Sequence, residues 1–266
     1  MRTEFLLPKY RLGSPICLIV PHGPDEAGTL EIARLVQKRL DCYAVLNTGY
    51  YRSATLDVGD DFANLNRKSH FLDPVVYQEY IEPIKLSRMY SWTARSDELV
   101  PPMNYIILHG MGHDRQFGDN VILGCGLNEK TDEVNGIRNP KHPTNTADPR
   151  FVSKFQQLLS KDMTNVSVAP FDHRFAAKSK SNLCWYLANG ASKIRYLLPA
   201  RVDPYLQSRF YTSSPLQAVQ VEISKNFRSS SPFIEQFARD FSQTLDELID
   251  FDFNLYCMKK FVLAKV

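Results

Sequence analysis

The sequence has no apolar run long enough to cross a membrane, and its cysteines form no recognisable pattern. The longest apolar stretches are strand-sized, well short of the ~18 residues that a membrane span needs. The five cysteines are spread along the chain without a CxxC pair, and an odd number without a framework favours a reducing compartment. The amino terminus lacks the apolar segment of a secretory leader. We therefore expect a cytoplasmic protein that makes no membrane contact.

Weak net charge and missing motifs narrow the possible functions further. The net charge is +3, and the basic residues are scattered rather than interleaved with aromatic residues, which argues against a nucleic-acid partner. The chain contains no GxSxG, GxxxxGK[ST] or GxGxxG sequence. It therefore lacks the nucleophile elbow, the phosphate loop and the dinucleotide-binding turn that those motifs form.

What the chain does contain is the composition of an ordinary soluble α/β protein. Its 266 residues are 44% hydrophobic and 23% charged, enough for a sizeable core. Apolar runs of strand length alternate with helical patterns, which predicts a mostly parallel, doubly wound sheet. We treat residues 1–266 as a single domain. The predicted strands are 16–20, 42–46, 103–110, 121–123, 166–170 and 216–223, with a further possible strand at 193–201.

Helix starts are marked by caps and prolines. Asp73-Pro74 and Asp148-Pro149 place an aspartate at the cap and a proline in the first turn. The first of these helices is expected to kink or split at Pro83. A third helix is predicted over about 28–40, and a long amphipathic helix from about residue 231 covers most of the carboxyl terminus.

The first candidate site follows the predicted strand at 16–20, where the chain reads PHGPDEAGT. In open α/β sheets ligands bind at the carboxyl ends of the strands. His22 with Glu26, or with Asp25, could supply an imidazole nitrogen and a carboxylate oxygen to one zinc ion. Alternatively, both acids simply occupy the first turn of the next helix, where the helix dipole stabilises them.

A second strand, 103–110, also ends in a His-Gly pair. His109 follows an apolar run, and Gly110 allows close backbone approach. A single histidine at the end of a strand is usually structural. Two strands that each end in a His-Gly pair, the first pair followed by acids, favour a shared metal ion. His113 is a weaker ligand candidate on the following loop.

Three further positions carry possible chemistry. Glu222 lies near the end of an apolar strand, where a carboxylate is costly unless it is paired or functional. It is either a general base or one half of a salt bridge. Asn66 and Arg67 could grip a substrate carboxylate, although the pair could equally be solvated on its loop. His173, in PFDHRF after a strand, could line a substrate pocket.

The ordered set PHGPDEAGTLEIA, NLNR, ILHGMG and VQVEI resembles the N-formylglutamate amidohydrolase-like group, which belongs with the zinc carboxypeptidase-like (M14-type) hydrolases. The first motif is also similar to the phage poly-γ-glutamate hydrolases. The resemblance spans about residues 16–228. It implies an α/β/α sandwich with a mainly parallel mixed sheet and one catalytic zinc. It departs from the usual HxxE spacing, which would select Asp25 rather than Glu26.

Carried over by motif, the resemblance implies a role for each matched residue. His22, Glu26 and His109 would be the zinc ligands, and Glu222 would be the base. Asn66 and Arg67 would hold a substrate carboxylate, with Arg67 also orienting the substrate for catalysis.

The implied activity is zinc-dependent hydrolysis of an amide bond next to a carboxylate, in an N-acyl amino acid or glutamyl-like substrate. Two other classes stay open: a small-molecule binding protein that lost the chemistry, and an interaction protein using the helix from 231. The expected partner is a small carboxylate substrate. A homo-oligomer that forms through that helix is compatible with both the hydrolase and the interaction protein.

Overall fold

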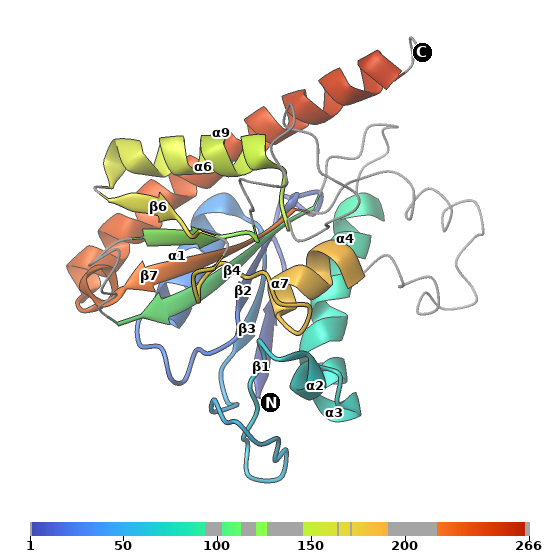
Figure 1. Ribbon diagram of the computed structural model, residues 1–266, viewed down its shortest axis with the longest axis vertical. Coiled ribbons are helices and arrows are strands. Elements are labelled where there is room, and N and C mark those ends of the chain that lie inside the picture. Colours follow the sequence, from blue (N-terminus) through green and yellow to red (C-terminus); the bar gives the residue numbers. More distant parts are fainter. Residues whose placement is uncertain are drawn as a thin grey trace.

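The computed structural model describes residues 2–93, 103–112, 121–126, 146–163, 165–170, 172–190 and 217–263. A seven-stranded sheet forms its centre, in the order β1-β3-β2-β4-β7-β5-β6 (Figure 1). The strands are β1 (Thr3–Leu6), β2 (Ile16–Val20), β3 (Tyr43–Asn47), β4 (Asn104–Met111), β5 (Val121–Gly124), β6 (Val166–Val168) and β7 (Gln217–Ser224).

The sheet is mixed but mostly parallel, as the alternating pattern predicted. Neighbours β3, β2, β4 and β7 run parallel. At the two sides, β1 pairs antiparallel with β3 and β5 pairs antiparallel with β7, while β6 runs parallel to β5. The predicted site residues of strands β2, β4 and β7 therefore lie on adjacent strands. Their carboxyl ends meet at one edge of the sheet, the edge at which such sheets bind ligands.

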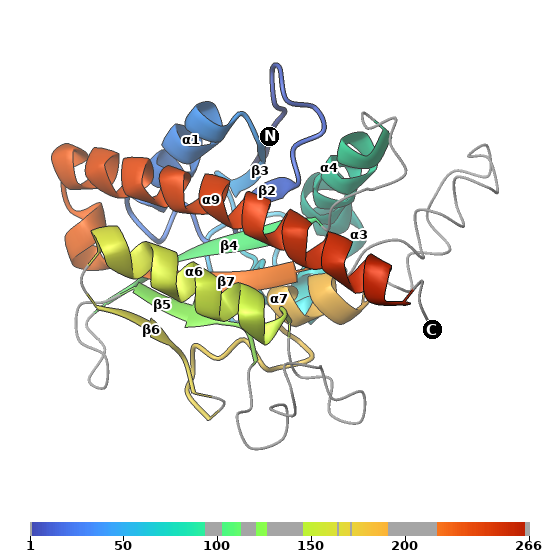
Figure 2. The same cartoon turned by 90° about the horizontal axis from the view of Figure 1, so that it is seen from above.

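Helices cover both faces of the sheet and make three layers. The helical segments are α1 (Thr29–Leu40), α2 (Lys68–Phe71), α3 (Pro74–Val76), η1 (Tyr77–Ile81), α4 (Glu82–Thr93), α6 (Pro149–Asp162), α7 (Leu183–Trp185), η2 (Tyr186–Gly190), η4 (Lys225–Arg228) and α9 (Ser231–Leu263). Strand side chains alternate between two buried apolar clusters. One cluster includes side chains of α1, α6 and α9, and the other includes side chains of η1, α4 and α7 (Figure 2). The predicted α/β/α architecture is confirmed.

The cap and proline signals operate as expected. Asp73 accepts hydrogen bonds from the backbone of Val75 and Val76, and Asp148 accepts one from Arg150. The predicted disturbance at Pro83 takes the form of a π-helical turn, η1, just before α4. Because a proline has no N–H, it cannot bond the carbonyl four residues earlier. The hydroxyl of Thr3 donates to that carbonyl, Glu79 O, instead.

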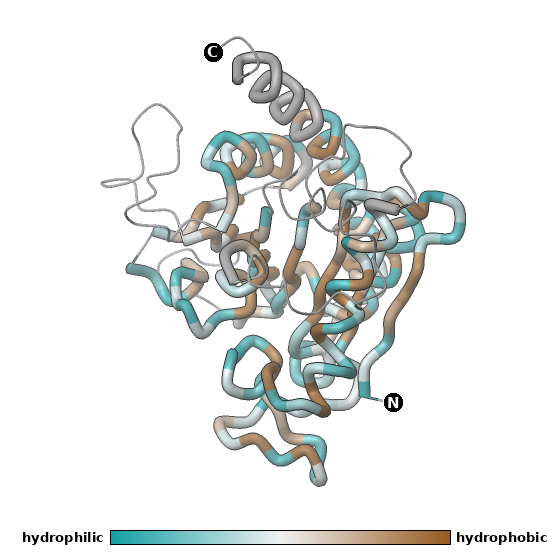
Figure 3. Tube along the Cα trace, turned by 90° about the vertical axis from the view of Figure 1, so that its right-hand side faces the viewer, coloured by the Kyte–Doolittle hydropathy of each residue, from teal (hydrophilic) through white to brown (hydrophobic). Residues whose placement is uncertain are grey.

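The long amphipathic helix predicted from residue 231 is α9, which packs against α1 and α6. Its inward side buries Phe237 and Phe241, while Phe233 on the outer side is 58% exposed. Figure 3 shows hydrophobic residues concentrated along the strands, whereas hydrophobic and hydrophilic residues alternate along the covering helices. This is the pattern of surface helices on a buried sheet.

Some predictions fall outside the described residues. These are His113, the centre of the loop at 126–148 and the possible strand at 193–201. Within the described part of the chain, no helix is both long and apolar enough to span a membrane.

Candidate metal centre

The loop after β2 folds into a tight turn that directs two side chains inward. The backbone N–H of Glu26 donates to the carbonyl of His22 at 3.0 Å, so the two residues lie one helical turn apart on the same side of the loop. Gly23 lets the loop pack closely against the end of β3, because a Cβ there would collide with the backbone oxygen of Asn47. Both His22 and Glu26 are buried.

The same turn separates Glu26 from Asp25. The Asp25 carboxylate is exposed, and its Oδ2 accepts a hydrogen bond from the backbone N–H of Arg52 at 2.7 Å. The Glu26 carboxylate points into the molecule, where its Oε2 accepts from the N–H of Gly110 at 2.7 Å. Of the two acids left open by the sequence, the structure places Glu26 beside the histidines.

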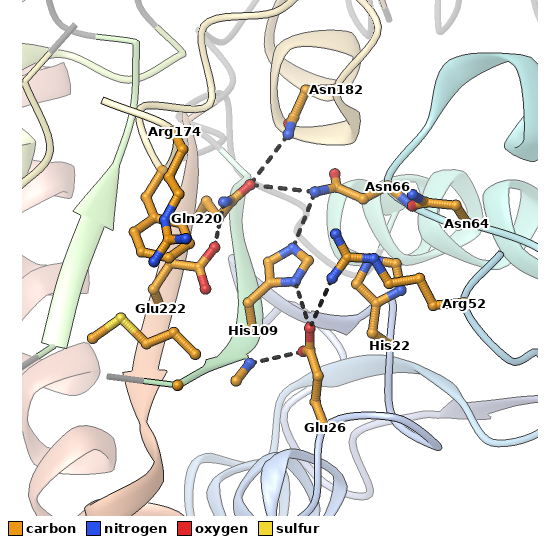
Figure 4. Close-up of a pocket in the computed structure, with 14 residues that line it drawn as sticks. His22, Glu26, Arg52, Asn64, Asn66, His109, Arg174, Asn182, Gln220 and Glu222 are labelled. Carbon is orange, nitrogen blue, oxygen red and sulfur yellow. Dashed lines mark hydrogen bonds and ion pairs between the residues drawn. The ribbon is translucent and has the colours of Figure 1, made fainter. Parts of the chain in front are cut away.

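His22, Glu26 and His109 converge on one point (Figure 4). Each offers a ligand atom, and these atoms all lie within 4.8 Å of one another. The two imidazole rings are 5.1 Å apart between centroids. Nδ1 of His109 lies 3.5 Å from Oε1 of Glu26, which is long for a hydrogen bond. It is close to the roughly 3.4 Å expected between two ligands of a tetrahedral zinc ion.

The electrostatics of the group suit a cation. Burial lowers the pKa of His22 to about 2, helped by His109 and Arg52. His22 is therefore neutral, as a metal ligand must be. Its Nδ1 is buried and has no hydrogen-bond partner among the described residues, a costly arrangement unless a ligand completes it. Burial alone would lower the pKa of His109, but the carboxylates of Glu26 and Glu222 outweigh it and raise that pKa.

Glu222 lies on β7 directly beside His109 in the parallel register. It is buried, and burial raises the pKa of its carboxyl group, while His109 partly opposes that rise. Nε2 of Gln220 donates to its Oε1 at 2.7 Å. Among the described residues no arginine forms an ion pair with it, so the salt-bridge alternative has no partner in that part of the chain. Glu222 is also outside the three-residue metal group.

A chain of side-chain amides leads from the start of α7 to Glu222. Leu183 N donates to Asn66 Oδ1 at 3.1 Å, and Cys184 N donates to Asn182 Oδ1 at 2.7 Å. A backbone N–H can only donate, so both amide nitrogens must face Gln220 Oε1, at 3.5 and 3.3 Å. This leaves the Gln220 nitrogen to donate to Glu222. The direction of every bond in the chain is thus fixed.

These groups line one open pocket of about 420 Å³. Two guanidinium groups stand in its lining: that of Arg52, whose Nη1 is 4.0 Å from Glu26 Oε1, and that of Arg174, which lies over the ring of Phe175. The pocket is lined by His22, Glu26, Arg52, Asn64, Asn66, His109, Gly110, Met111, Gly112, Arg174, Phe175, Asn182, Gln220 and Glu222.

Two predicted substrate residues are not among the described residues that line the pocket. Arg67 donates through Nη1 to the carbonyl of Ala54 at 3.0 Å. His173 accepts from the N–H of Phe175 on its own loop. Asn66 does line the pocket, and its Nδ2 lies 3.2 Å from Nε2 of His109. The substrate-binding roles given to these three residues stay predictions.

Sequence reasoning placed Arg174 only among several loop residues that could line a pocket, and it did not single out Arg52, Asn182 or Gln220. Only Gln220 carried a usable signal. It stands two residues before Glu222 on a strand, and side chains two apart share one face of a sheet. Arg52, Arg174 and Asn182 come from loops whose approach to the site depends on the tertiary fold.

Comparisons with known proteins define no family for this chain. No family model matches it, and no curated protein matches it. Among solved structures it is similar to a zinc-free structure of YndL, at 15% identity and a TM-score of 0.47, covering 94% of this chain and 90% of that one. A bacteriophage poly-γ-glutamate hydrolase matches at 14% identity and 0.44, with the same coverage.

A third similar structure is the gene product Atu2144 of Agrobacterium tumefaciens, at 10% identity and a TM-score of 0.49, covering 93% of this chain and 94% of that one. These likenesses are too distant to support a function. What the geometry itself defines is an α/β/α protein with a buried His-Glu-His group at the carboxyl edge of its sheet.

Proposed function

We propose that this protein is a zinc-dependent hydrolase of amide bonds that lie next to a carboxylate. The observation that carries the proposal is the convergence of His22, Glu26 and His109 within 4.8 Å, with Glu222 on the adjacent strand. Two histidines and one glutamate are a ligand set of catalytic zinc sites, which keep a position open, whereas structural sites are closed and rich in cysteine.

Zinc held there would act as a Lewis acid towards the substrate carbonyl and would lower the pKa of a coordinated water towards ~7. We assign the proton transfer to Glu222. Only its Oε1 is hydrogen-bonded within the described part of the chain, so Oε2 is free to take a proton from the attacking water. The water oxygen bonds to the carbonyl carbon, the C–N bond breaks, and Oε2 returns the proton to the leaving nitrogen.

The environment of Glu222 supports both halves of this role. A base works best when its pKa lies near the working pH, and burial moves the pKa of this carboxyl upward. The hydrogen bond from Gln220 keeps Oε1 as an acceptor, so the carboxylate cannot rotate freely. Glu222 therefore presents one oxygen in one direction.

The pocket suits an anionic substrate. Arg52 and Arg174 both stand in its lining, and a guanidinium binds a carboxylate through two parallel hydrogen bonds. We assign the substrate carboxylate to one of these two arginines in preference to Arg67, which donates to the Ala54 carbonyl. The choice of an N-acyl amino acid or glutamyl-like substrate rests on the sequence motifs.

The proposal is tested by measuring metal content and hydrolysis together. Purified protein is expected to hold one zinc per chain and to release amine from a panel of N-formyl, N-acetyl and γ-glutamyl amino acids. Glu222→Gln should keep the zinc and lose the activity by about 10²- to 10⁴-fold, the usual contribution of a general base. Full activity in Glu222→Gln would overturn the base assignment. A folded protein with no zinc and no hydrolysis of the panel would overturn the function.

A further inference from the structure

Arg228 joins the three segments that carry the candidate site. It ends η4, immediately after β7. Its Nε donates to the carbonyl of Ile223 at 3.0 Å and its Nη2 to that of Met111 at 3.0 Å. Its Nη1 donates to the carbonyl of Ala27. One guanidinium thus contacts the ends of β7 and β4 and the loop after β2.

Each of these contacts lies next to a site residue. Ile223 follows Glu222, Met111 is two residues beyond His109, and Ala27 follows Glu26. The ladder between β2 and β4 pairs Ile16–Ile19 with Asn104–Ile107 and ends there. The loop with His22 and Glu26 lies beyond the last pair, so strand pairing does not set its position against His109.

Two glycines make the room that Arg228 occupies. A Cβ at Gly110 would lie 2.5 Å from the Cζ of Arg228, and one at Gly28 would lie 2.7 Å from the Arg228 carbonyl oxygen. Gly28 also has φ +85, a conformation that side chains rarely adopt. The N–H of Gly110 donates to Glu26, so this glycine touches the guanidinium at its Cα and the carboxylate through its nitrogen.

Among the described residues, Arg228 forms no ion pair with a single carboxylate, and its charge acts on the two acids of the site instead. All its side-chain hydrogen bonds among the described residues go to backbone carbonyls. Burial lowers its pKa, and the carboxylates of Glu26 and Glu222 oppose that change, which means that both acids lie near enough to feel its charge. An arginine stays protonated in proteins.

We propose that Arg228 is a positioning residue: by bonding three carbonyls at once, it holds His22 and Glu26, His109, and Glu222 at the separations that a divalent metal and a base require. This inference rests on the proposed function for its catalytic part. A lysine could not replace it fully, because one ammonium lacks the planar fork that reaches carbonyls in several directions.

The test compares Arg228→Ala and Arg228→Lys with Arg150→Ala. Arg150 contacts Asp148 at the start of α6, and the backbone N–H of Asp148 bonds Gln217 at the amino end of β7, so the control lies at the opposite end of the same strand. Zinc affinity is expected to fall about 10- to 100-fold in Arg228→Ala, the range seen when groups that orient metal ligands are removed. It should fall less in Arg228→Lys and stay unchanged in Arg150→Ala.

Added guanidinium ion, at concentrations that do not denature the protein, should restore part of the zinc affinity and of kcat in Arg228→Ala, with little change in KM. Urea has nearly the same shape without the charge and should restore neither. If Arg228 were purely structural, Arg228→Ala would lower the thermal midpoint of unfolding, and guanidinium would not restore zinc affinity and kcat selectively. Unchanged zinc affinity in a folded Arg228→Ala, or equal rescue by urea, would overturn the proposal. If Arg228→Ala fails to fold, Arg228→Lys gives the same comparison.

A readout without metal separates this inference from the proposed function. In the metal-free protein, the amide proton resonance of Gly110 reports its hydrogen bond to Glu26. That resonance should move upfield in Arg228→Ala and stay in place in Arg150→Ala. If wild-type protein binds zinc but hydrolyses nothing, the function fails and the positioning role stands. If the Gly110 resonance and zinc affinity are unchanged in Arg228→Ala, the positioning role fails whatever the activity.

Discussion

In the part of the chain that the structure describes, buried polar atoms without hydrogen-bond partners occur both at the carboxyl edge of the sheet and under the helical layer of α3, η1 and α4. At the sheet edge one such atom is Nδ1 of His22, and in the helical layer the atoms are Nζ of Lys85 and the hydroxyls of Tyr77 and Tyr80. All of them carry the cost of lost hydration. What differs between the two places is the set of neighbours.

Around His22 the neighbours are electron-pair donors. Glu26 and His109 face it, and an amide chain fixes Glu222 close by. The group has negative charge and lone pairs that a cation would satisfy. Lys85 is itself the cation, and its ammonium lies over the ring of Tyr77, 4.4 Å from the ring centroid. The same lack of a partner therefore fits a metal-ligand role at His22, whereas at Lys85 it is a cost to stability.

The largest effect is expected from removing the histidines. His22→Ala or His109→Ala should weaken zinc binding by at least about 100-fold, because a lost ligand costs more than the 10- to 100-fold of a lost orienting group. Metal content after dialysis measures this. His173→Ala is the control, because His173 is not among the described residues that line the pocket. This variant should keep its metal. Stoichiometric zinc in both alanine variants of the site would break the contrast with Lys85.

A second, smaller effect separates the two neighbouring acids. Glu26→Gln removes a buried carboxylate of the metal group and should lower zinc affinity about 10- to 100-fold or more. Asp25→Asn changes an exposed carboxylate that bonds the backbone of Arg52 and should leave the affinity within a few-fold. Competition with a coloured chelator measures both. Equal losses in the two variants would show that the carboxylates act together through their loop.

The amide chain should give an intermediate effect on turnover alone. Gln220→Leu removes the donor to Glu222 Oε1, so the base loses its fixed direction. We expect kcat to fall about 10- to 100-fold, with zinc affinity retained. Steady-state kinetics over a range of pH measures this. A Gln220→Leu enzyme with normal kcat would mean that the network serves the fold of α7 rather than the base.

The smallest effect concerns Lys85. Burial lowers its pKa to about 8, below the value of ~10.4 in an unfolded chain. Between these two pH values the unfolded state binds more protons, so this residue makes stability rise with pH. Lys85→Met should stabilise the protein at pH 7 by about 1 kcal/mol, after allowance for solvent screening. The gain should vanish near the upper end of that window.

Chemical denaturation of wild-type protein and Lys85→Met at several pH values gives the difference in free energy of unfolding directly. Other tyrosines and lysines titrate in both proteins and cancel in the comparison. A constant difference across this range would contradict the assignment of the pH dependence to Lys85. Loss of stability at pH 7 in the variant would mean that the contact with Tyr77 outweighs the burial of charge.

The parts of this molecule that sequence predicted are those set by local chemistry. Asp73 and Asp148 cap their helices, and apolar runs gave the strands β2, β4 and β7 nearly to the residue. His22 and His109 could be paired because each ends such a run before a glycine. Parallel strands bring their carboxyl ends to one edge, so the meeting of these residues followed from topology.

The parts that sequence did not predict depend on long-range approach. Arg67 fits the motif better than Arg52 or Arg174, yet these two line the pocket because their loops fold over it. Nothing in the sequence around Arg228 singles it out, and the role we propose for it depends on three carbonyls from separate segments. At the π-helical turn before Pro83, the carbonyl of Glu79 accepts from the hydroxyl of Thr3, a partner far away in sequence.

We propose that His22, Glu26 and His109 bind one zinc ion together, and X-ray absorption of the zinc-loaded protein tests this most directly. The predicted spectrum has nitrogen and oxygen neighbours at about 2.0–2.2 Å, with two imidazoles, and no sulfur at ~2.3 Å. In His22→Ala one imidazole contribution should disappear. A sulfur shell, or an imidazole count that His22→Ala and His109→Ala leave unchanged, would place the metal elsewhere and contradict the account.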